Sequence, residues 1–421
     1  MKESSISIST SSISSKKNLE SMTKYVLQLQ SEVMRLQEIK KEKTVKKRRI
    51  DFSRYGRRQI ALKFLYFGWS HSGFAHQPHV QNTIEHYILD SLKKTQLIED
   101  DSDFTTLNYS HCGRTDKSVN ALEQVISLQV RSRLENDANG DVIPDSSVEE
   151  IDYLKILNKS AHPDVIFTAW APVKSDFSSR FHCAYRTYKY YFPACNLNIA
   201  LMKEAAKYLE GTHDFRNFCK IDKSKDFINT ERTILHTDIE SISGSSSFCA
   251  FVIRGHAFLY HQVRLIVAIL FAVGMELESP DIVKKLLDLE LFPQRPQFTL
   301  AEGYPLVLFE TSFNYELNWI TQHSNIQYLR KRLAEHSVKS ILIQDMINSF
   351  PAEPQSTGID FKSKAFNKFV PEIPSFLQCD LFSLPKTKRY VNIERRAVCA
   401  QSGIPAKKAK ISDDSSTSAV S

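Results

Sequence analysis

The sequence has 421 residues, of which 42% are hydrophobic and 11% aromatic, so most of it is expected to be globular with two or three domains. Its seven cysteines contain no Cys-x-x-Cys pair and no zinc-ligand spacing, which suits a reducing compartment and thiols packed as small core residues. No apolar run is long enough to cross a membrane, and the Ser-rich N-terminus resembles neither a signal peptide nor a transit peptide.

The net charge of +7 is concentrated in one segment. Residues 40–58 hold ten Lys and Arg against Glu42 and Asp51, a net charge of +8, so the rest of the chain sums to −1. Such a cluster can be a nuclear-import signal, a polyanion-binding arm or a solvated linker, and these interpretations do not exclude one another.

The region in front of the globular part is expected to hold a disordered stretch, residues 1–18, and then a helix and the basic segment within 19–56. Apolar residues in this region alternate in steps of three and four: Leu19, Met22, Val26, Leu29, Val33 and Leu36. This spacing predicts a helix with an apolar seam of about two and a half heptads. Such a helix either packs on the body of the protein or associates with a second copy.

The globular part is expected to begin near residue 57 and to mix strands with helices. Alternating apolar residues predict strands at 58–69, 124–130, 164–173, 186–192, 246–258 and 304–313. Helical spacing predicts helices at 82–95, 199–211, 260–275 and 280–289. The order predicts an α+β protein with two mixed halves, 57–162 and 163–320, around a cleft, and a partly disordered C-terminal extension over 321–421.

The stretch "YSHCGRTDKSVNALEQVISLQVRS" places one carboxylate, Asp116, between the cations Arg114 and Lys117, just before a strand that is expected to be buried. An aspartate in such a loop is usually a turn residue that hydrogen-bonds to its own backbone. The alternative is a functional carboxylate, and other parts of the chain bear on that choice.

Two further residues carry possible chemistry. Arg264 is the single cation in the apolar stretch "VRLIVAILFAVG", and a buried guanidinium requires a carboxylate or phosphate partner unless it reaches solvent at the end of its helix. Tyr188 lies in "RTYKYYF", where a tyrosine is either core material or, if it faces a cleft, a surface that stacks on a base. Together with Asp116, these residues suit chemistry on a nucleobase extruded from its helix.

At these residues the sequence resembles the TruA family of tRNA pseudouridine synthases. "CGRTDKSVNA" resembles the catalytic loop of that family, "RTYKYYF" its Arg-x-Tyr-x-Tyr strand and "FLYHQVRLIVAIL" its His-x-x-Val-Arg helix. "GTHDFRNF" and "AEGYPLVLF" match two more blocks in the same order, so the likeness covers roughly 57–315. Within the family, the likeness is greatest to the eukaryotic branch that modifies tRNA positions 38 and 39.

The resemblance implies two ferredoxin-like halves with antiparallel sheets that form a V-shaped basic cleft. It also implies conversion of uridine to pseudouridine in the tRNA anticodon stem-loop, without metal or cofactor, by a homodimer found in the nucleus and the cytoplasm. Asp116 matches the catalytic carboxylate, which acts as nucleophile at C1′ or as base at C2′ of the ribose. Arg264 matches the arginine that pairs with it, Arg114 the residue beside the flipped base, and Tyr188 the tyrosine that stacks on the uracil. Lys117 is expected to contact phosphate.

Two positions depart from the family pattern. Ser118 stands where the family most often has glycine, and a positive φ there would cost about 1 kcal/mol. Asn120 replaces a residue that is often His or Ser. A protein whose loop is distorted at Ser118 would bind tRNA without converting it, and the same enzyme class acting on other RNA positions is a third possibility.

Overall fold

The structure is a computed structural model that describes residues 50–137, 142–220, 229–242, 245–349 and 390–399. Residues Phe52–Ser421 form one compact unit, and Met1–Asp51 form another. The expected disordered stretch at 1–18, the apolar seam at 19–36 and most of the basic segment lie outside the described residues. Within the described residues, no helix is both long enough and apolar enough to cross a bilayer.

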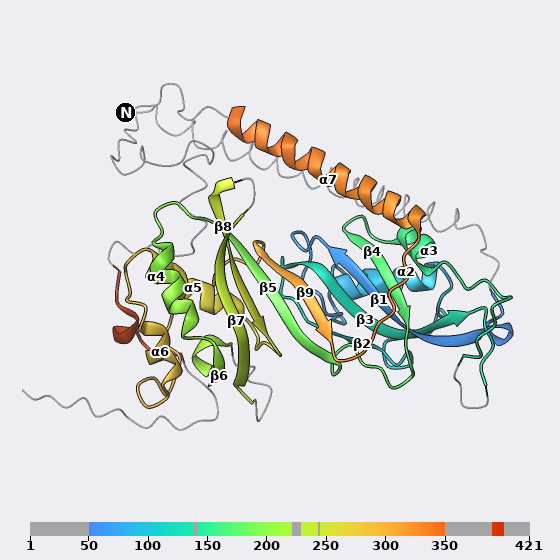
Figure 1. Ribbon diagram of the computed structural model, residues 1–421, viewed down its shortest axis with the longest axis horizontal. Coiled ribbons are helices and arrows are strands. Elements are labelled where there is room, and N and C mark those ends of the chain that lie inside the picture. Colours follow the sequence, from blue (N-terminus) through green and yellow to red (C-terminus); the bar gives the residue numbers. More distant parts are fainter. Residues whose placement is uncertain (1–49, 138–141, 221–228, 243–244, 350–389, 400–421) are drawn as a thin grey trace, which may run out of the picture. The chain divides into compact units, whose positions relative to one another are not determined.

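A mixed sheet of nine strands forms the centre of the described part of Phe52–Ser421, in the order β4-β1-β3-β9-β5-β8-β7-β6, with β2 also paired to β3 (Figure 1). The strands are β1 (Gly56–Tyr66), β2 (Ser110–His111), β3 (Asn120–Ser132), β4 (Val165–Pro172), β5 (Cys183–Pro193), β6 (Gly211–Asp214), β7 (Glu231–Ile242), β8 (Ser245–Gly255) and β9 (Leu306–Phe313). The α+β class predicted from the sequence is confirmed.

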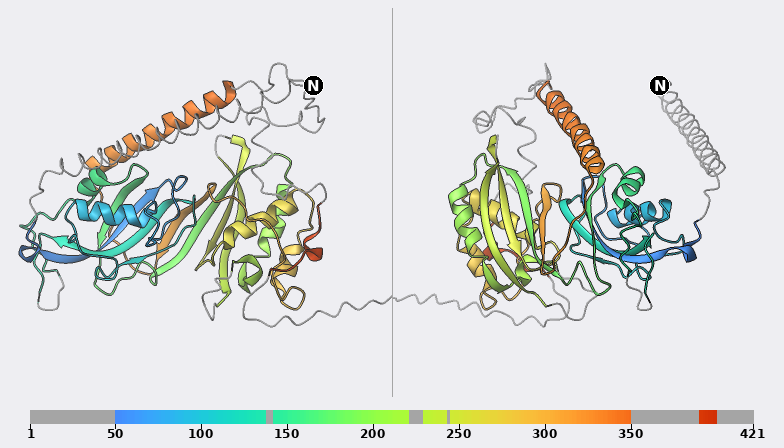
Figure 2. Two further views of the ribbon diagram at one scale, coloured as in Figure 1. Left: turned by 180° about the vertical axis from the view of Figure 1, so that it is seen from behind. Right: turned by 45° about the vertical axis from the view of Figure 1, so that its right-hand side comes forward.

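Helices accompany each part of the sheet, with α2 and α3 beside β1 and β4, with α4 and α5 beside β5, β7 and β8, and with α6 against α4 (Figure 2). They are α2 (Ile84–Lys94), α3 (Tyr153–Ser160), α4 (Ile199–Lys207), α5 (Gln262–Gly274), α6 (Ile282–Leu287) and α7 (His323–Ser349), with short 3-10 turns at Phe52–Arg54, Arg216–Phe218 and Ile393–Arg395. The helix α2 begins where the Thr83 side chain accepts a hydrogen bond from the amide of His86, as an N-cap does.

The two expected halves meet in this one sheet, because β3 and β9 pair in parallel through Asn120–Val307 and Ala121–Leu308. The other strand pairs among the described residues are antiparallel. The strand β4 follows the expected boundary at 162/163 in the sequence, but it pairs with β1 of the first half. The chain passes to the other part of the sheet only after β4, because β5 pairs with β9. The division into two domains stays a prediction.

The helix α5 is fixed to the sheet by apolar packing. Nearly all of its residues are buried, and the ring of Phe271 lies 5.9 Å from Tyr190 and 5.4 Å from Phe192, both on β5. Residues 188, 190 and 192 alternate onto the same face of β5, so α5 covers the face that also carries Tyr188. The strand and the helix that resemble two family blocks are therefore neighbours.

The described residues after 320 are the helix α7 (His323–Ser349) and residues 390–399, which pack on the rest of the compact unit. The Glu278 carboxylate accepts hydrogen bonds from the Tyr390 hydroxyl (2.8 Å) and the Ile393 amide (2.7 Å), and Ile393 is buried. The apolar residues of α7 follow no single stripe, which is why helical spacing gave no signal there.

Candidate active site

The loop that carries Asp116 connects β2 to β3 and is held by hydrogen bonds to the end of β1 and to the segment that follows it. The Tyr66 hydroxyl lies 2.8 Å from Thr115 Oγ1, and the Phe74 amide donates to the Thr115 carbonyl at 3.1 Å. Within the loop, the Val119 amide donates to the Asp116 carbonyl at 3.2 Å. The backbone on each side of Asp116 is therefore fixed before any substrate is present.

Ser118 adopts a left-handed conformation with φ 66°, as expected if the position suits the glycine of the family pattern. Its amide donates to the His71 carbonyl at 3.2 Å, so the neighbouring segment holds the strained residue in place. Gly73 in that segment has φ 109°, and a Cβ there would lie 3.2 Å from the Thr115 carbonyl oxygen. The close approach of the two segments therefore needs glycine at position 73.

Asp116 and Arg264 meet at the first turn of α5, as predicted. Arg264 Nη1 donates to Asp116 Oδ2 at 3.4 Å, while its Nε donates to the Ala301 carbonyl at 2.8 Å. Both side chains are largely buried, with 18% of Asp116 and 13% of Arg264 exposed. The partner that a buried guanidinium requires is thus a carboxylate 148 residues away in the sequence.

Burial raises the pKa of Asp116 above its ordinary value, and the Arg264 guanidinium lowers it by less. The loss of water around the carboxylate thus outweighs its attraction to the guanidinium. The consequence is a carboxylate that takes up a proton more readily than an exposed aspartate does. Such a group suits a reaction in which a carboxylate forms and then breaks a covalent bond, or accepts and then returns a proton.

His261 is a second neighbour of Asp116 to which sequence reasoning gave no role. Its Nε2 lies 3.7 Å from Asp116 Oδ2, and the residue itself is left-handed, with φ 65°, directly before α5. Burial and the nearby cations, first Arg264 and then Lys220, lower the pKa of His261 to about 4, so the imidazole is neutral at neutral pH. His261 belongs to the motif "HQVR" that the sequence analysis identified, but only the arginine of that motif was given a function.

Tyr188 lies beside the Asp116 loop on the face that α5 covers. A Cβ at Gly113 would be 3.6 Å from the Tyr188 hydroxyl, and the ring of Phe258 packs edge-on against Tyr188 at 5.1 Å. Burial strongly raises the pKa of Tyr188, so its hydroxyl keeps its proton at neutral pH. The phenol can therefore donate a hydrogen bond to a base but is a poor proton acceptor.

The two cations near Asp116 in the sequence lie at the surface. Arg114 and Lys117 are both exposed, and Arg114 Nε donates to His111 Nε2 at 3.1 Å. Exposed cations that flank a partly buried carboxylate can reach phosphates of a bound nucleic acid. The structure thus separates the carboxylate from the positive charges that precede and follow it.

Arg186 ties three loops of the site together through their backbone. Its Nε and Nη2 donate to the Cys112 carbonyl at 3.0 and 2.7 Å, and Nη2 also donates to the Arg180 carbonyl at 3.1 Å. Its Nη1 donates to the carbonyls of Cys183 (3.3 Å) and His256. A buried guanidinium is satisfied here by main-chain oxygens instead of a carboxylate.

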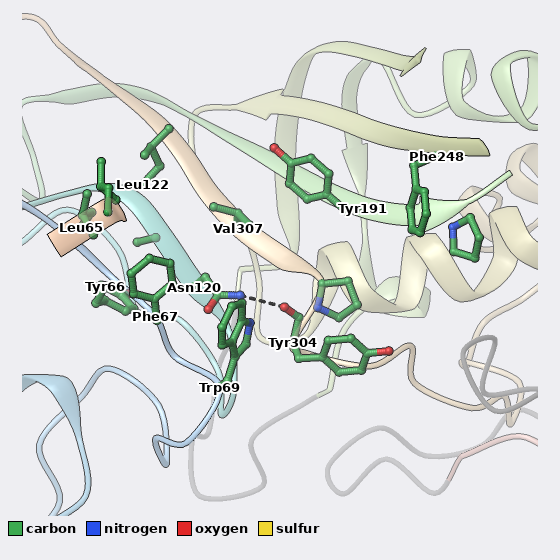
Figure 3. Close-up of a pocket in the computed structure, with 14 residues that line it drawn as sticks. Leu65, Tyr66, Phe67, Trp69, Asn120, Leu122, Tyr191, Phe248, Tyr304 and Val307 are labelled. Carbon is green, nitrogen blue, oxygen red and sulfur yellow. Dashed lines mark hydrogen bonds between the residues drawn. The ribbon is translucent and has the colours of Figure 1, made fainter. Parts of the chain in front are cut away.

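Asn120, the second departure from the family pattern, links two segments that flank the site. Its Oδ1 accepts from the Gly68 amide at 2.8 Å, and its Nδ2 donates to the Tyr304 carbonyl at 2.7 Å. Figure 3 shows the latter bond at the wall of an apolar pocket of about 520 Å³. Tyr191 lines this pocket. Successive side chains of β5 point to opposite faces of the sheet, so Tyr191 lies on the face opposite Tyr188 and Tyr190. The pocket is therefore separate from the Asp116 site.

One group among the described residues brings three potential metal ligands together, namely His71, His162 and Asp164. His71 Nδ1 lies 2.9 Å from Asn82 Oδ1, and its Nε2 lies 2.9 Å from Asp164 Oδ2. Both ring nitrogens of His71 thus have hydrogen-bonding partners. These contacts explain the group, and we assign it no metal.

Comparison with known proteins places these residues in a family. Residues 205–314 match the family model described as tRNA pseudouridine synthase. The chain is 39% identical over 390 residues to the human tRNA pseudouridine(38/39) synthase, which covers 85% of this chain and 80% of that protein. It is 42% identical over 275 residues to the Saccharomyces cerevisiae tRNA pseudouridine(38/39) synthase, which covers 65% of this chain and 61% of that protein.

A more distant likeness extends to archaea. The chain is 28% identical over 295 residues to the tRNA pseudouridine synthase A of Methanosarcina barkeri, which covers 69% of this chain and 99% of that protein. The human relative is well above 30% identical, and the match covers most of both chains. The chain therefore belongs to the tRNA pseudouridine synthase family.

Proposed function

We propose that this protein isomerises uridine to pseudouridine at positions 38 and 39 of the tRNA anticodon stem-loop, and that Asp116 is the carboxylate that acts on the flipped nucleotide. The observation that carries the assignment of Asp116 is its pairing with Arg264 at 3.4 Å, at a site built from both parts of the sheet. The human and yeast relatives named for positions 38 and 39 support the choice of substrate.

The reaction breaks the C1′–N1 bond, forms a C1′–C5 bond and moves the C5 proton to N1, so no atom is gained or lost. A carboxylate can begin it as a nucleophile at C1′ or as a base at C2′. The contacts from Arg264 and His261 both reach Oδ2 of Asp116. We propose that Oδ1 is the oxygen that meets the ribose.

Neighbouring groups have separate tasks in this proposal. The protonated hydroxyl of Tyr188 donates to the detached uracil, and its ring stacks on that base. Arg114 occupies the place beside the flipped nucleotide and contacts phosphate, as does Lys117. Base extrusion requires such contacts, because unstacking a nucleotide costs a few kcal/mol.

The decisive experiment compares Asp116→Asn with wild type in position-resolved mapping of pseudouridine on a tRNA that has uridine at positions 38 and 39. We expect no detectable product from Asp116→Asn, wild-type affinity for tRNA and a normal product yield from the exposed control Asp176→Asn. Product formed at the wild-type rate by Asp116→Asn would remove the assignment. If wild type binds tRNA without product and Ser118→Gly restores it, the RNA-binding alternative is correct.

Two further properties are proposed from the family resemblance and the sequence alone. Two copies associate as a homodimer, in which the apolar seam at 19–36 contributes, so deleting that stretch should lower the mass measured by light scattering. The protein resides in the nucleus and the cytoplasm, with the +8 segment at 40–58 acting as import signal, RNA-binding arm or both. If the segment is an import signal, removing residues 40–49 should shift a fluorescent fusion to the cytoplasm. If it is an RNA-binding arm, the same deletion should flatten the salt dependence of tRNA binding.

A further inference from the structure

Two exposed aromatic rings near the site each lie beside a cation. Phe181 is 80% exposed, and the guanidinium carbon of Arg180 lies 5.2 Å from its ring centroid. Tyr260 is 52% exposed, and Lys220 Nζ lies 5.8 Å from its ring centroid. A single exposed apolar side chain needs no explanation, but a ring paired with a cation is a common arrangement for binding single-stranded nucleic acid.

The Phe181 ring is on a loop that the Arg186 side chain links to the Asp116 loop. The carbonyl of the preceding residue, Arg180, and the carbonyl of Cys112 accept hydrogen bonds from the same nitrogen, Nη2 of Arg186, at 3.1 and 2.7 Å. Cys112 precedes Asp116 by four residues. Phe181 is therefore at the edge of the site that β2, β5 and the Asp116 loop build.

The Tyr260 ring lies next to a residue that contacts Asp116. Its centroid is 3.8 Å from that of His261, whose Nε2 is 3.7 Å from Asp116 Oδ2. The Lys220 amide donates to the Tyr260 carbonyl at 3.0 Å, which holds the backbones of the two residues together. One residue thus separates this exposed ring from the carboxylate.

We propose that Phe181 and Tyr260 stack on the two nucleotides that flank the flipped uridine, one ring to each side. Extrusion of a base leaves its neighbours without a stacking partner, and an exposed ring near the carboxylate can replace that contact. Arg180 and Lys220 then face the phosphates of the same two nucleotides. This inference rests on the proposed function and adds the residues that hold the strand around the target.

The test measures affinity for an anticodon stem-loop RNA and the rate of pseudouridine formation in the full-length protein. We expect Phe181→Ala and Tyr260→Ala each to weaken binding by roughly fivefold or more, since base–aromatic stacking contributes about 1–3 kcal/mol per base. Phe181→Trp should retain wild-type binding, whereas Phe181→Leu, which keeps an apolar side chain but no ring, should not. The control Ile341→Ala removes an equally exposed apolar side chain from α7 and should bind as wild type.

A substrate change identifies the nucleotide that each ring contacts. An abasic site at the flanking nucleotide should weaken wild-type binding and should have no further effect on the variant that lacks its partner ring, as in a double-mutant cycle. The slope of log K against log salt should fall for Arg180→Gln and stay unchanged for Phe181→Ala. Wild-type affinity in the Phe181→Ala, Tyr260→Ala double variant, or equal binding by the Trp and Leu variants, would overturn the inference. Absence of product from wild type refutes the proposed function instead, and the binding comparison still decides the stacking.

Discussion

The two segments that bring Asp116 and Arg264 together are held in place by different forces. The loop at 113–119 is polar and fixed by hydrogen bonds with the Tyr66 hydroxyl, the Phe74 amide and the His71 carbonyl. The helix α5 is apolar and fixed by packing, with Phe271 between two rings of β5. Hydrogen bonds thus position the carboxylate of Asp116, and apolar packing positions the guanidinium of Arg264. Different substitutions are therefore expected to disturb the two segments.

The two segments also share a feature, a left-handed residue other than glycine beside the ion pair. Ser118 has φ 66° in the loop, and His261 has φ 65° just before α5. Strained backbone of this kind persists where the surrounding structure determines it, and it often occurs at functional sites. The comparison therefore predicts large stability effects on the helix side and smaller, more local effects on the loop side.

The largest expected effect is on the helix side. Phe271→Ala leaves a cavity between α5 and β5 and should lower the free energy of unfolding by about 3–5 kcal/mol, measured by chemical denaturation. The exposed Leu342→Ala on α7 is the matched control and should change that free energy by less than about 1 kcal/mol. Equal losses in both variants would show that α5 is not held by packing.

Arg264→Gln tests the pairing itself and should lower the rate of pseudouridine formation by about 100-fold through misplacement of Asp116. The guanidinium lowers the pKa of Asp116, so its removal raises that pKa further. The carboxylate then becomes protonated at a higher pH, and the acidic limb of the pH–rate profile moves upward. Arg264→Lys keeps the charge and should shift the limb less; an unmoved limb in Arg264→Gln would contradict the pairing.

Tyr66→Phe tests the loop side by removing the hydroxyl that lies 2.8 Å from Thr115 Oγ1. The buried threonine hydroxyl loses a partner, which should lower the free energy of unfolding by about 1–2 kcal/mol. The rate should fall together with it, because Thr115 precedes Asp116. The second-site change Thr115→Val in the same protein should recover part of the lost stability, and no recovery would argue against this bond as the support.

Ser118→Gly has the smallest expected effect. Glycine adopts the left-handed conformation without strain, so the substitution should raise the free energy of unfolding by about 1 kcal/mol or less. The rate should change little, because Asp116 and Arg264 already meet with serine present. Ser179→Gly, at a position without positive φ, is the control and should not stabilise the protein.

Much of the fold could be predicted from the sequence because its signals are local. The alternation in β1 and β5 and the apolar run of α5 identify those elements without any tertiary information. A local argument required a carboxylate or phosphate partner for a buried Arg264, and the family resemblance named Asp116 as that partner. The positive φ of Ser118 was anticipated from the glycine that the family pattern has there.

Other features depend on tertiary contacts that a sequence pattern does not contain. The parallel pairing of Asn120 with Val307 joins segments 187 residues apart, and no local periodicity encodes it. The net rise in the pKa of Asp116 reflects how deeply the loop is covered, which is known only once the fold is. The role of Arg186 was missed for the same reason, because two of its partners, the main-chain carbonyls of Cys112 and His256, lie in loops 74 and 70 residues away in the sequence.

The way Arg186 is bound has a consequence for how such a protein can diversify. The Arg186 guanidinium donates to main-chain carbonyl oxygens, so these hydrogen bonds do not depend on the side chains of the residues that accept them. The residues at the rim can then be exchanged over evolutionary time while the three loops keep their register. A change in the preferred RNA would need new side chains on the three loops, whereas Arg186 and the residues around Asp116 could stay the same.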